Sequence, residues 1–288
     1  MNKLLIIADI EDGCAAIPRG LVLAKEMDLQ PEIIAFTWAD IQRLKVDSAT
    51  AAKIKKQLLE ERKATISTRI AKYAGDDNKI KRHVIWAEDI HTPIMKRVTS
   101  DFMAVVKSRH QSKSLGHTPT DWHLLRECPV PVLLVGKKKW LRSAPILASV
   151  DLAATSSTKQ KLNIDVILEA RHYAEIFNAE LQVLCVIDVP AVLTELDIID
   201  AKSYAKQREV ELKPKLIALA EATGLSPKLF KLKRGPVDKT IVSEAHDLKP
   251  QLLVMGTVGR KGIKAKLLGN TAESVLQLLN SDTLTIKP

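Results

Sequence analysis

The sequence is poor in the residues that specialised proteins depend on. It has only three cysteines, Cys14, Cys128 and Cys185, which are scattered and form no CxxC pair. A reducing compartment therefore fits better than a disulfide framework. No apolar run approaches the roughly 18 residues of a membrane-spanning helix, and the apolar start over residues 1–7 is too short for a signal peptide. We therefore expect a soluble cytoplasmic protein without a membrane partner.

Aromatic residues are also scarce, at 4% of the chain, although the net charge is +10. Nucleic-acid-binding modules gather cations on one face and interleave aromatic side chains that stack on bases. The cations here are spread along the chain, with one tight run at Lys137, Lys138 and Lys139 where a linker is expected. The composition therefore argues against specific nucleic-acid binding.

What the sequence does contain is an alternation of short apolar runs with amphipathic stretches, present twice. Strands are expected over residues 3–9, 32–36, 79–86, 102–106 and 131–135, and again over 145–151, 181–188, 228–233, 252–255 and 283–286. Helices are expected between them, with the long helix of each half ending at Gly75 and Gly224. Residues 115–118 align with residues 268–271, which indicates a tandem duplication with domains 1–140 and 141–288. This alternation predicts an α/β fold with parallel sheets covered on both faces.

A glycine-rich loop follows the strand expected over residues 252–255. It contains Gly256, Gly259 and Gly269 together with several cations, and Asn270 is the predicted N-cap of the next helix. Glycines let the backbone approach a phosphate, and a helix N-terminus presents free N–H groups to it. The alternative is a basic surface loop whose glycines only make turns.

Ligands of such sheets bind at the carboxyl ends of the strands, where neighbouring crossovers diverge. Asp9 and Asp151 end the first strand of each half, so Asp151 and the glycine loop are expected to face one crevice. Both aspartates are equally explained as buried caps at strand ends. His110, His117, His123 and Cys128 suggest zinc weakly, because core or surface roles are commoner for such residues. No catalytic set and no required metal are predicted.

Three motifs carry a family resemblance over the whole chain: Ile146-Leu147 to Asp151, Leu184-Cys185-Val186-Ile187-Asp188, and Met255-Gly256-x2-Gly259-x9-Gly269. With residues 118–126 and 268–273, they identify the chain as resembling the universal stress protein family, in its tandem bacterial form. The resemblance implies two tandem doubly wound, Rossmann-like sheets of five parallel strands in the order 3-2-1-4-5. It also implies that the two domains pair as an intramolecular pseudo-dimer, through strands 131–135 and 283–286.

Some members of this family bind ATP, so the resemblance implies ATP or AMP as a ligand of the C-terminal domain. Asp151 would contact the adenine-ribose side and the Val186 backbone would read the adenine edge. Gly256, Gly259 and Gly269 would cradle the ribose and phosphates, beside Thr271 in the following helix. The family pattern has Ser or Thr after the last glycine, and this chain has Asn270.

The first half departs further from that pattern, because Lys107, His110 and Gly116 fall where the three glycines are expected. Its nucleotide loop is therefore interpreted as degenerate. The resulting hypothesis is a non-catalytic cytoplasmic stress-response protein that senses an adenine nucleotide through its C-terminal domain. The alternatives are a binding module without nucleotide, acting on a protein or a small apolar ligand, and a slow ATPase. A further homodimer is compatible with each of them.

Overall fold

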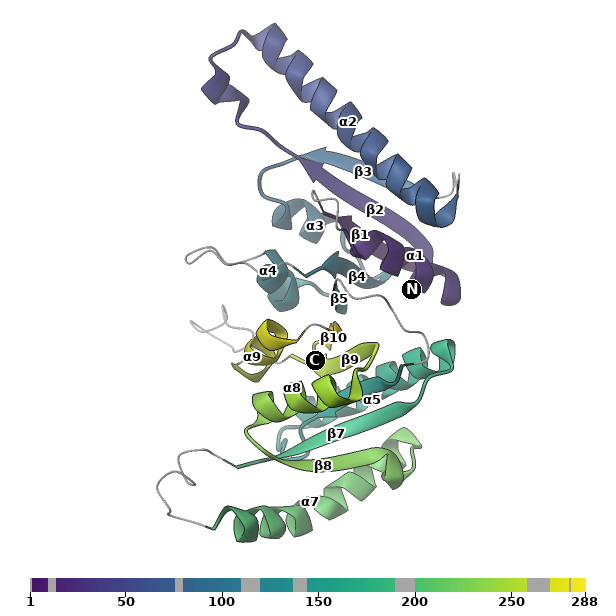
Figure 1. Ribbon diagram of the computed structural model, residues 1–288, viewed down its shortest axis with the longest axis vertical. Coiled ribbons are helices and arrows are strands. Elements are labelled where there is room, and N and C mark those ends of the chain that lie inside the picture. Colours follow the sequence, from purple (N-terminus) through teal and green to yellow (C-terminus); the bar gives the residue numbers. More distant parts are fainter. Residues whose placement is uncertain are drawn as a thin grey trace. The chain divides into compact units, whose positions relative to one another are not determined.

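Two α/β units follow each other along the chain, Met1–Lys137 and Lys138–Pro288. The computed structural model describes residues 2–9, 14–75, 80–109, 120–136, 144–189, 200–257, 270–279 and 281–288. Strands and helices alternate throughout the described part of both units (Figure 1).

The elements of the N-terminal unit are β1 (Lys3–Ala8), α1 (Ala16–Glu26), β2 (Gln30–Thr37), the short 3-10 helix η1 (Ile41–Leu44), α2 (Ser48–Ala74), β3 (Lys81–Trp86), α3 (His91–Arg97), β4 (Phe102–Ser108), α4 (Thr120–Glu127) and β5 (Val132–Val135). Those of the C-terminal unit are β6 (Ile146–Val150), α5 (Ser157–Phe177), β7 (Leu181–Asp188), α7 (Ala201–Thr223), the short 3-10 helix η2 (Pro227–Leu229), β8 (Phe230–Gly235), α8 (Val237–Leu248), β9 (Leu252–Gly256), α9 (Asn270–Leu278) and β10 (Asp282–Ile286).

The strand order is the same in both units. It is β3-β2-β1-β4-β5 in the N-terminal unit and β8-β7-β6-β9-β10 in the C-terminal unit, and every strand pair within a unit is parallel across the described residues. The predicted α/β class and the order 3-2-1-4-5 are therefore confirmed. The first strand of each unit is central: β1 lies between β2 and β4, and β6 lies between β7 and β9. The chain adds strands first on one side of this strand and then on the other. The carboxyl end of that strand is the switch point at which such sheets bind ligands.

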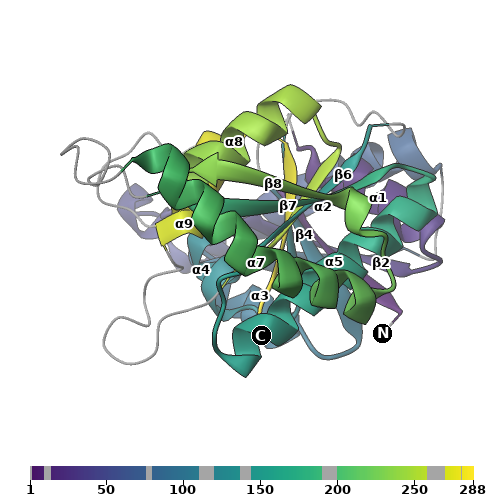
Figure 2. The same cartoon turned by 90° about the horizontal axis from the view of Figure 1, so that it is seen from below.

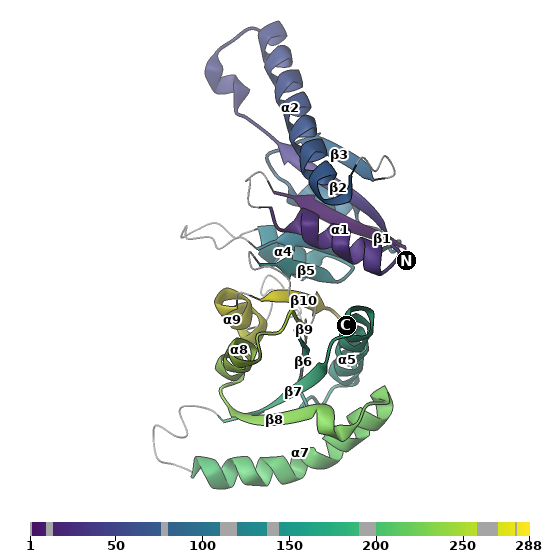
Figure 3. The ribbon, with the colours of Figure 1, turned by 45° about the vertical axis from the view of Figure 1, so that its right-hand side comes forward.

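Helices cover both faces of each sheet. In the C-terminal unit α5 packs with α7, and α8 packs with α9 on the other face (Figures 2 and 3). In the N-terminal unit α1 packs with α2, and α3 packs with α4. Burial on both sides explains why β1 reads as the continuous apolar run Leu4 to Ala8, in which every residue is buried.

The helix ends follow local sequence signals. Asp47 caps α2, because its Oδ1 accepts hydrogen bonds from the N–H groups of Ala49 and Thr50, both at 2.9 Å. The predicted stops at Gly75 and Gly224 are confirmed, with φ of 66° and 65° that favour glycine. The predicted N-cap at Asn270 is wrong, since Asn270 already belongs to α9. The apolar periodicity of a helix fixes which face is buried but not which residue opens its first turn.

Within the described residues, no helix combines the length and the apolarity that crossing a bilayer requires.

Candidate functional site

A pocket of about 550 Å³ opens at the carboxyl ends of β6, β7 and β9 in the C-terminal unit. Four residues predicted from the sequence line it together: Asp151 after β6, Val186 in β7, Gly256 at the end of β9 and Thr271 in the first turn of α9. Gly259 and Gly269 lie outside the described residues, as does the side chain of Asn270. The strand order brings these separated segments together, because β6 lies between β7 and β9.

Asp151 both caps the end of its strand and faces the pocket. Its Oδ1 accepts a hydrogen bond from the N–H of Ala153 at 2.9 Å, which closes a tight turn after β6. Asn163 of α5 holds the backbone of Asp151 from both sides: its Oδ1 accepts from the Asp151 N–H at 3.0 Å, and its Nδ2 donates to the Asp151 carbonyl at 2.7 Å. Unlike Asp9, Asp151 is exposed. The two interpretations of this aspartate therefore combine, since a capped but exposed carboxylate remains accessible to a ligand.

Gly256 is required by helix packing. A Cβ added at this position would lie 2.6 Å from Cδ2 and 2.9 Å from Cγ of Leu162 in α5, closer than atoms in contact can lie. The absence of a side chain therefore lets α5 approach the end of β9, and Leu162 reaches the pocket wall beside this glycine. This packing role accounts for Gly256 whether or not a ligand is bound.

Three further residues that the sequence did not indicate line the same pocket: Lys159 of α5, and Tyr204 and Arg208 of α7. They add two cations and one aromatic ring to a wall that also contains Leu162 and Ile241. Their helical spacing could have shown that Tyr204 and Arg208, four residues apart, share one face of α7. Which element that face meets is decided only by the tertiary structure.

Cys185 lies in β7 next to Val186 but is buried and does not line the pocket. Burial raises the pKa of the Cys185 thiol to about 12, and the negative charge of Asp151 acts in the same direction. The thiol therefore stays protonated at neutral pH and is not a nucleophile.

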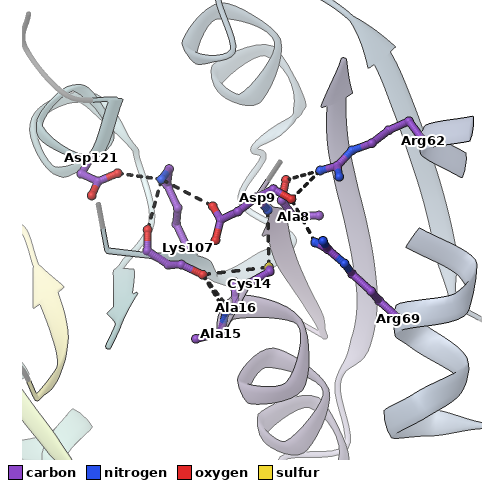
Figure 4. Close-up of polar contacts among 10 residues, drawn as sticks. Ala8, Asp9, Cys14, Ala15, Ala16, Arg62, Arg69, Lys107 and Asp121 are labelled. Carbon is purple, nitrogen blue, oxygen red and sulfur yellow. Dashed lines mark hydrogen bonds and ion pairs between the residues drawn. The ribbon is translucent and has the colours of Figure 1, made fainter. Parts of the chain in front are cut away.

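The same place in the N-terminal unit is filled by a buried ion cluster (Figure 4). Lys107 lies near the end of β4, where the resemblance places a glycine, and its side chain is only 3% exposed. Its Nζ lies 2.8 Å from Oδ1 of Asp121 and 3.9 Å from Oδ1 of Asp9, and it donates to the Ser108 carbonyl at 3.1 Å. All three charged side chains are buried. The cation of Lys107 therefore satisfies the strand-end carboxylate of Asp9 from within the protein.

The backbone groups around this cluster are also occupied (Figure 4). The Ser108 hydroxyl accepts hydrogen bonds from the N–H groups of Ala15 and Ala16, at 3.0 and 2.9 Å, where α1 begins. Nη2 of Arg62 donates a hydrogen bond to the Asp9 carbonyl at 2.6 Å. Burial, followed by the charge of Arg69, lowers the pKa of the Arg62 guanidinium. The amides that would meet an anion at this helix N-terminus are thus already bonded to a side chain.

Comparisons with known proteins bear on the family and the fold of the chain. The model of the universal stress protein family matches residues 152–287. Universal stress protein E of Escherichia coli K12 is 30% identical over 298 aligned positions, which cover 100% of this chain and 94% of that protein. A crystal structure of a functionally unknown protein from Pseudomonas aeruginosa PAO1 has a TM-score of 0.72 at 23% identity, covering 100% of this chain and 93% of that one. A universal stress protein from Archaeoglobus fulgidus has a TM-score of 0.67 at 16% identity, with coverages of 99% and 96%, and like the Pseudomonas structure it supports the fold alone.

Proposed function

This chain belongs to the universal stress protein family, and from that premise we propose that it is a non-catalytic stress-response protein of the cytoplasm whose C-terminal unit binds an adenine nucleotide. One observation carries the proposal. Asp151, Val186, Gly256 and Thr271, which the family resemblance assigns to nucleotide binding, line a single pocket. Its volume of about 550 Å³ falls within the range of small-molecule sites.

The chemistry of the pocket lining suits the parts of such a ligand. Asp151 offers a carboxylate to the ribose hydroxyls, and the backbone of Val186 offers hydrogen-bonding groups to the edge of the base. The first turn of α9, which includes Thr271, presents backbone N–H groups and the positive end of a helix dipole to a phosphate. Lys159 and Arg208 add positive charge to the pocket lining.

The proposal assigns the nucleotide to the C-terminal unit alone. In the N-terminal unit Lys107 already satisfies Asp9, and Ser108 already accepts from the first N–H groups of α1. A phosphate entering there would have to displace these interactions and face the buried carboxylate of Asp121. We therefore expect one nucleotide per chain.

Replacing Thr271 by Glu tests this assignment without disturbing the fold. Thr271 is exposed, and a carboxylate in the first turn of α9 favours the helix dipole. The same carboxylate would repel a phosphate, so AMP and ATP affinity measured by titration calorimetry should fall by at least about tenfold. Gly259→Glu should also lower nucleotide affinity, because a negatively charged side chain would enter the proposed path of the phosphates. The control is Ser48→Glu, which places the same charge in the first turn of α2 in the other unit. Equal affinity in Thr271→Glu and Ser48→Glu would contradict the assignment.

A second candidate function is the binding of a small apolar ligand without nucleotide. The apolar part of the pocket wall, which includes Leu162, Leu212, Ile241 and Met255, favours it. Asn270 favours it as well, since the family pattern has a hydroxyl there. Mass spectrometry of the small molecules released from purified, denatured protein separates the two candidates, because each predicts a different compound class.

The proposal also holds that bound ATP is not turned over. Hydrolysis needs a metal near the β and γ oxygens and a group that orients the attacking water. The acidic candidates are Asp151, Asp188 and Glu273. Asp151 caps the turn after β6 and is assigned to the ribose, Asp188 ends β7, and Glu273 lies in the first turn of α9, where the helix dipole explains it. Phosphate release under excess ATP and magnesium should stay far below the ~1 s⁻¹ of slow ordinary enzymes. A rate near that value, lost in Thr271→Glu, would refute the non-catalytic assignment.

The pairing of the two units stays a prediction of the duplicated sequence. β5 and β10 are the last strands of their own sheets, and open edge strands favour aggregation unless they are covered. If they pair with each other, their backbone amides should exchange slowly in hydrogen-exchange experiments on the full chain. Fast exchange in either strand would contradict the pairing.

A further inference from the structure

Two histidines and a glutamate meet between α3 and α4 of the N-terminal unit, outside both sites described above. His91 is the first residue of α3, and His123 and Glu127 lie one turn apart on α4. The two helices pack against each other next to the sheet (Figure 1). One ligand atom from each of the three side chains lies within 4.8 Å of the others.

The local structure directs these groups toward one another. The Asp89 side chain accepts hydrogen bonds from the N–H groups of His91 and Thr92, at 2.9 and 3.3 Å, which holds the start of α3. The four-residue spacing of His123 and Glu127 places both on one face of α4. Their side chains are 39% and 50% exposed, and that of His91 is 20% exposed, so the α4 side of the cluster faces solvent.

The distances suit a small metal ion. Two ligands that each lie about 2.1 Å from a tetrahedral ion are roughly 3.4 Å apart. Nε2 of His91 lies 3.1 Å from Oε2 of Glu127, and Nδ1 of His123 lies 3.8 Å from Oε1 of the same carboxylate, so the two separations bracket that value. The three ligand atoms lie within 4.8 Å of one another, so side-chain rotations at the partly exposed His123 and Glu127 are needed to bring all three to bonding distance.

Two observations favour a cation over a simple ion pair. The Nε2 atom of His91 is buried and makes no hydrogen bond within the described residues, despite its nearness to Glu127. A protonated His91 would explain that contact but would not explain the second imidazole, whose ring centroid lies 5.2 Å from that of His91. Two imidazoles and a carboxylate are a ligand set that zinc takes in proteins, with a fourth position left for water.

We infer that His91, His123 and Glu127 form a binding site for a divalent transition-metal ion, with zinc as the ion that the ligand set favours. The ion would join α3 to α4 through one imidazole of α3 and two side chains of α4. This assignment departs from the expectation that no metal is required. The sequence grouped His123 with His110, His117 and Cys128 and did not indicate His91 or Glu127, which the tertiary structure brings to it.

The guanidinium of Arg126 would compete with a metal ion for Nδ1 of His123. Its Nη2 lies 2.9 Å from Nδ1 of His123, and because arginine only donates, this nitrogen must accept the hydrogen bond. A metal bound at Nδ1 therefore has to displace the guanidinium. Arg126→Met should tighten zinc binding several-fold. Lys96→Met, which removes a cation of α3 without releasing a histidine nitrogen, should change it less.

Isothermal titration calorimetry of the full chain with zinc tests the site. We expect about one tight equivalent, and a loss of affinity of at least about tenfold in each of His91→Gln, His123→Gln and Glu127→Gln, since even outer-shell partners of metal ligands are worth that much. Cobalt in place of zinc should give the visible absorption of a four-coordinate site. Circular dichroism checks that each variant is folded.

Two matched controls complete the design. His246 is an exposed histidine whose Nδ1 lies 3.4 Å from Asp247 without a second imidazole near it among the described residues, so His246→Gln should leave binding unchanged. His117→Gln should also leave it unchanged. Loss of binding in His117→Gln together with retention in Glu127→Gln would overturn the proposal in favour of the other histidine set. Absence of a tight equivalent, or equal binding in all variants, would overturn it as well.

Discussion

Replacing Lys107 by Met should strongly destabilise the N-terminal unit. The change removes one cation and keeps an apolar stem of similar length, so it opens little or no cavity. It leaves Asp121 and Asp9, which lie 2.8 and 3.9 Å from the lost Nζ, as buried carboxylates without this partner. The perturbation is therefore almost purely electrostatic.

The expected magnitude follows from that burial. The side chains of Lys107, Asp9 and Asp121 are 3%, 5% and 7% exposed, so water cannot replace the ammonium. Removing one member of a buried ion pair costs about 3–5 kcal/mol. Adding Asp121→Asn removes the nearer uncompensated charge, so the double variant should be more stable than Lys107→Met alone. The coupling free energy between the two positions should be about 1–3 kcal/mol.

Urea denaturation followed by tryptophan fluorescence measures this effect in the correct unit. Three of the four tryptophans, Trp38, Trp86 and Trp122, lie in the N-terminal unit, so the fluorescence reports mainly on its unfolding. Lys63→Met, at an exposed position of α2, is the matched control and should change the free energy of unfolding by less than about 0.5 kcal/mol. A cost below about 1 kcal/mol for Lys107→Met, or a further loss of stability on adding Asp121→Asn, would refute the reasoning.

Three further predictions concern single residues. Gly256→Ala should destabilise the C-terminal unit by about 1–3 kcal/mol, because the added Cβ would lie 2.6 Å from Leu162; denaturation of Gly256→Ala with Leu162→Ala should show partial relief, and no relief would contradict the packing account. Burial opposes the charge of Glu32, but the side-chain hydrogen bond and charge of Arg97 outweigh it and hold the pKa of Glu32 below its ordinary value of 4.5. The stability from this pair should be complete above pH 4.5 and should decline as the pH falls through the lower pKa of the folded state. Glu32→Gln should therefore be less stable than the parent by about 1 kcal/mol at neutral pH and should approach the parent in acid. A stability difference between the two proteins that is constant with pH would argue against the ion pair. Native Cys185, with a pKa of about 12, should resist alkylation at pH 8 until the protein is unfolded, and rapid labelling would show that the thiol is accessible.

Much of the fold could be predicted from the sequence because the signals are local. The apolar run of β1 and the glycines after α2 and α7 depend on burial and backbone conformation within a few residues. The repetition of these signals in the second half indicated two units of the same kind. The position of Asp151 at the end of the sixth strand also followed from the sequence, and a parallel sheet then places it at a ligand-binding edge.

The sequence could not show what each of these residues meets. Lys159, Tyr204 and Arg208 reach the pocket only because α5 and α7 pack on the same face of the sheet. Gly256 could be taken for a phosphate-binding glycine until the position of Leu162 revealed a packing role. Such contacts join segments that are distant along the chain, and hydrophobic periodicity carries no information about the partner of a face.

The sequence by itself determined the order of strands and helices, the duplication and the chemistry at the strand ends, because each of these depends on neighbouring residues. Only the tertiary structure decided which groups fill the strand end of the N-terminal unit and which residues line the pocket of the C-terminal unit. Asp9 and Asp151 occupy equivalent places, yet Asp9 is buried against Lys107 while Asp151 faces a pocket. The physical reason is that burial and charge pairing depend on distances in space, and β1 and β4 bring together residues separated by almost a hundred positions.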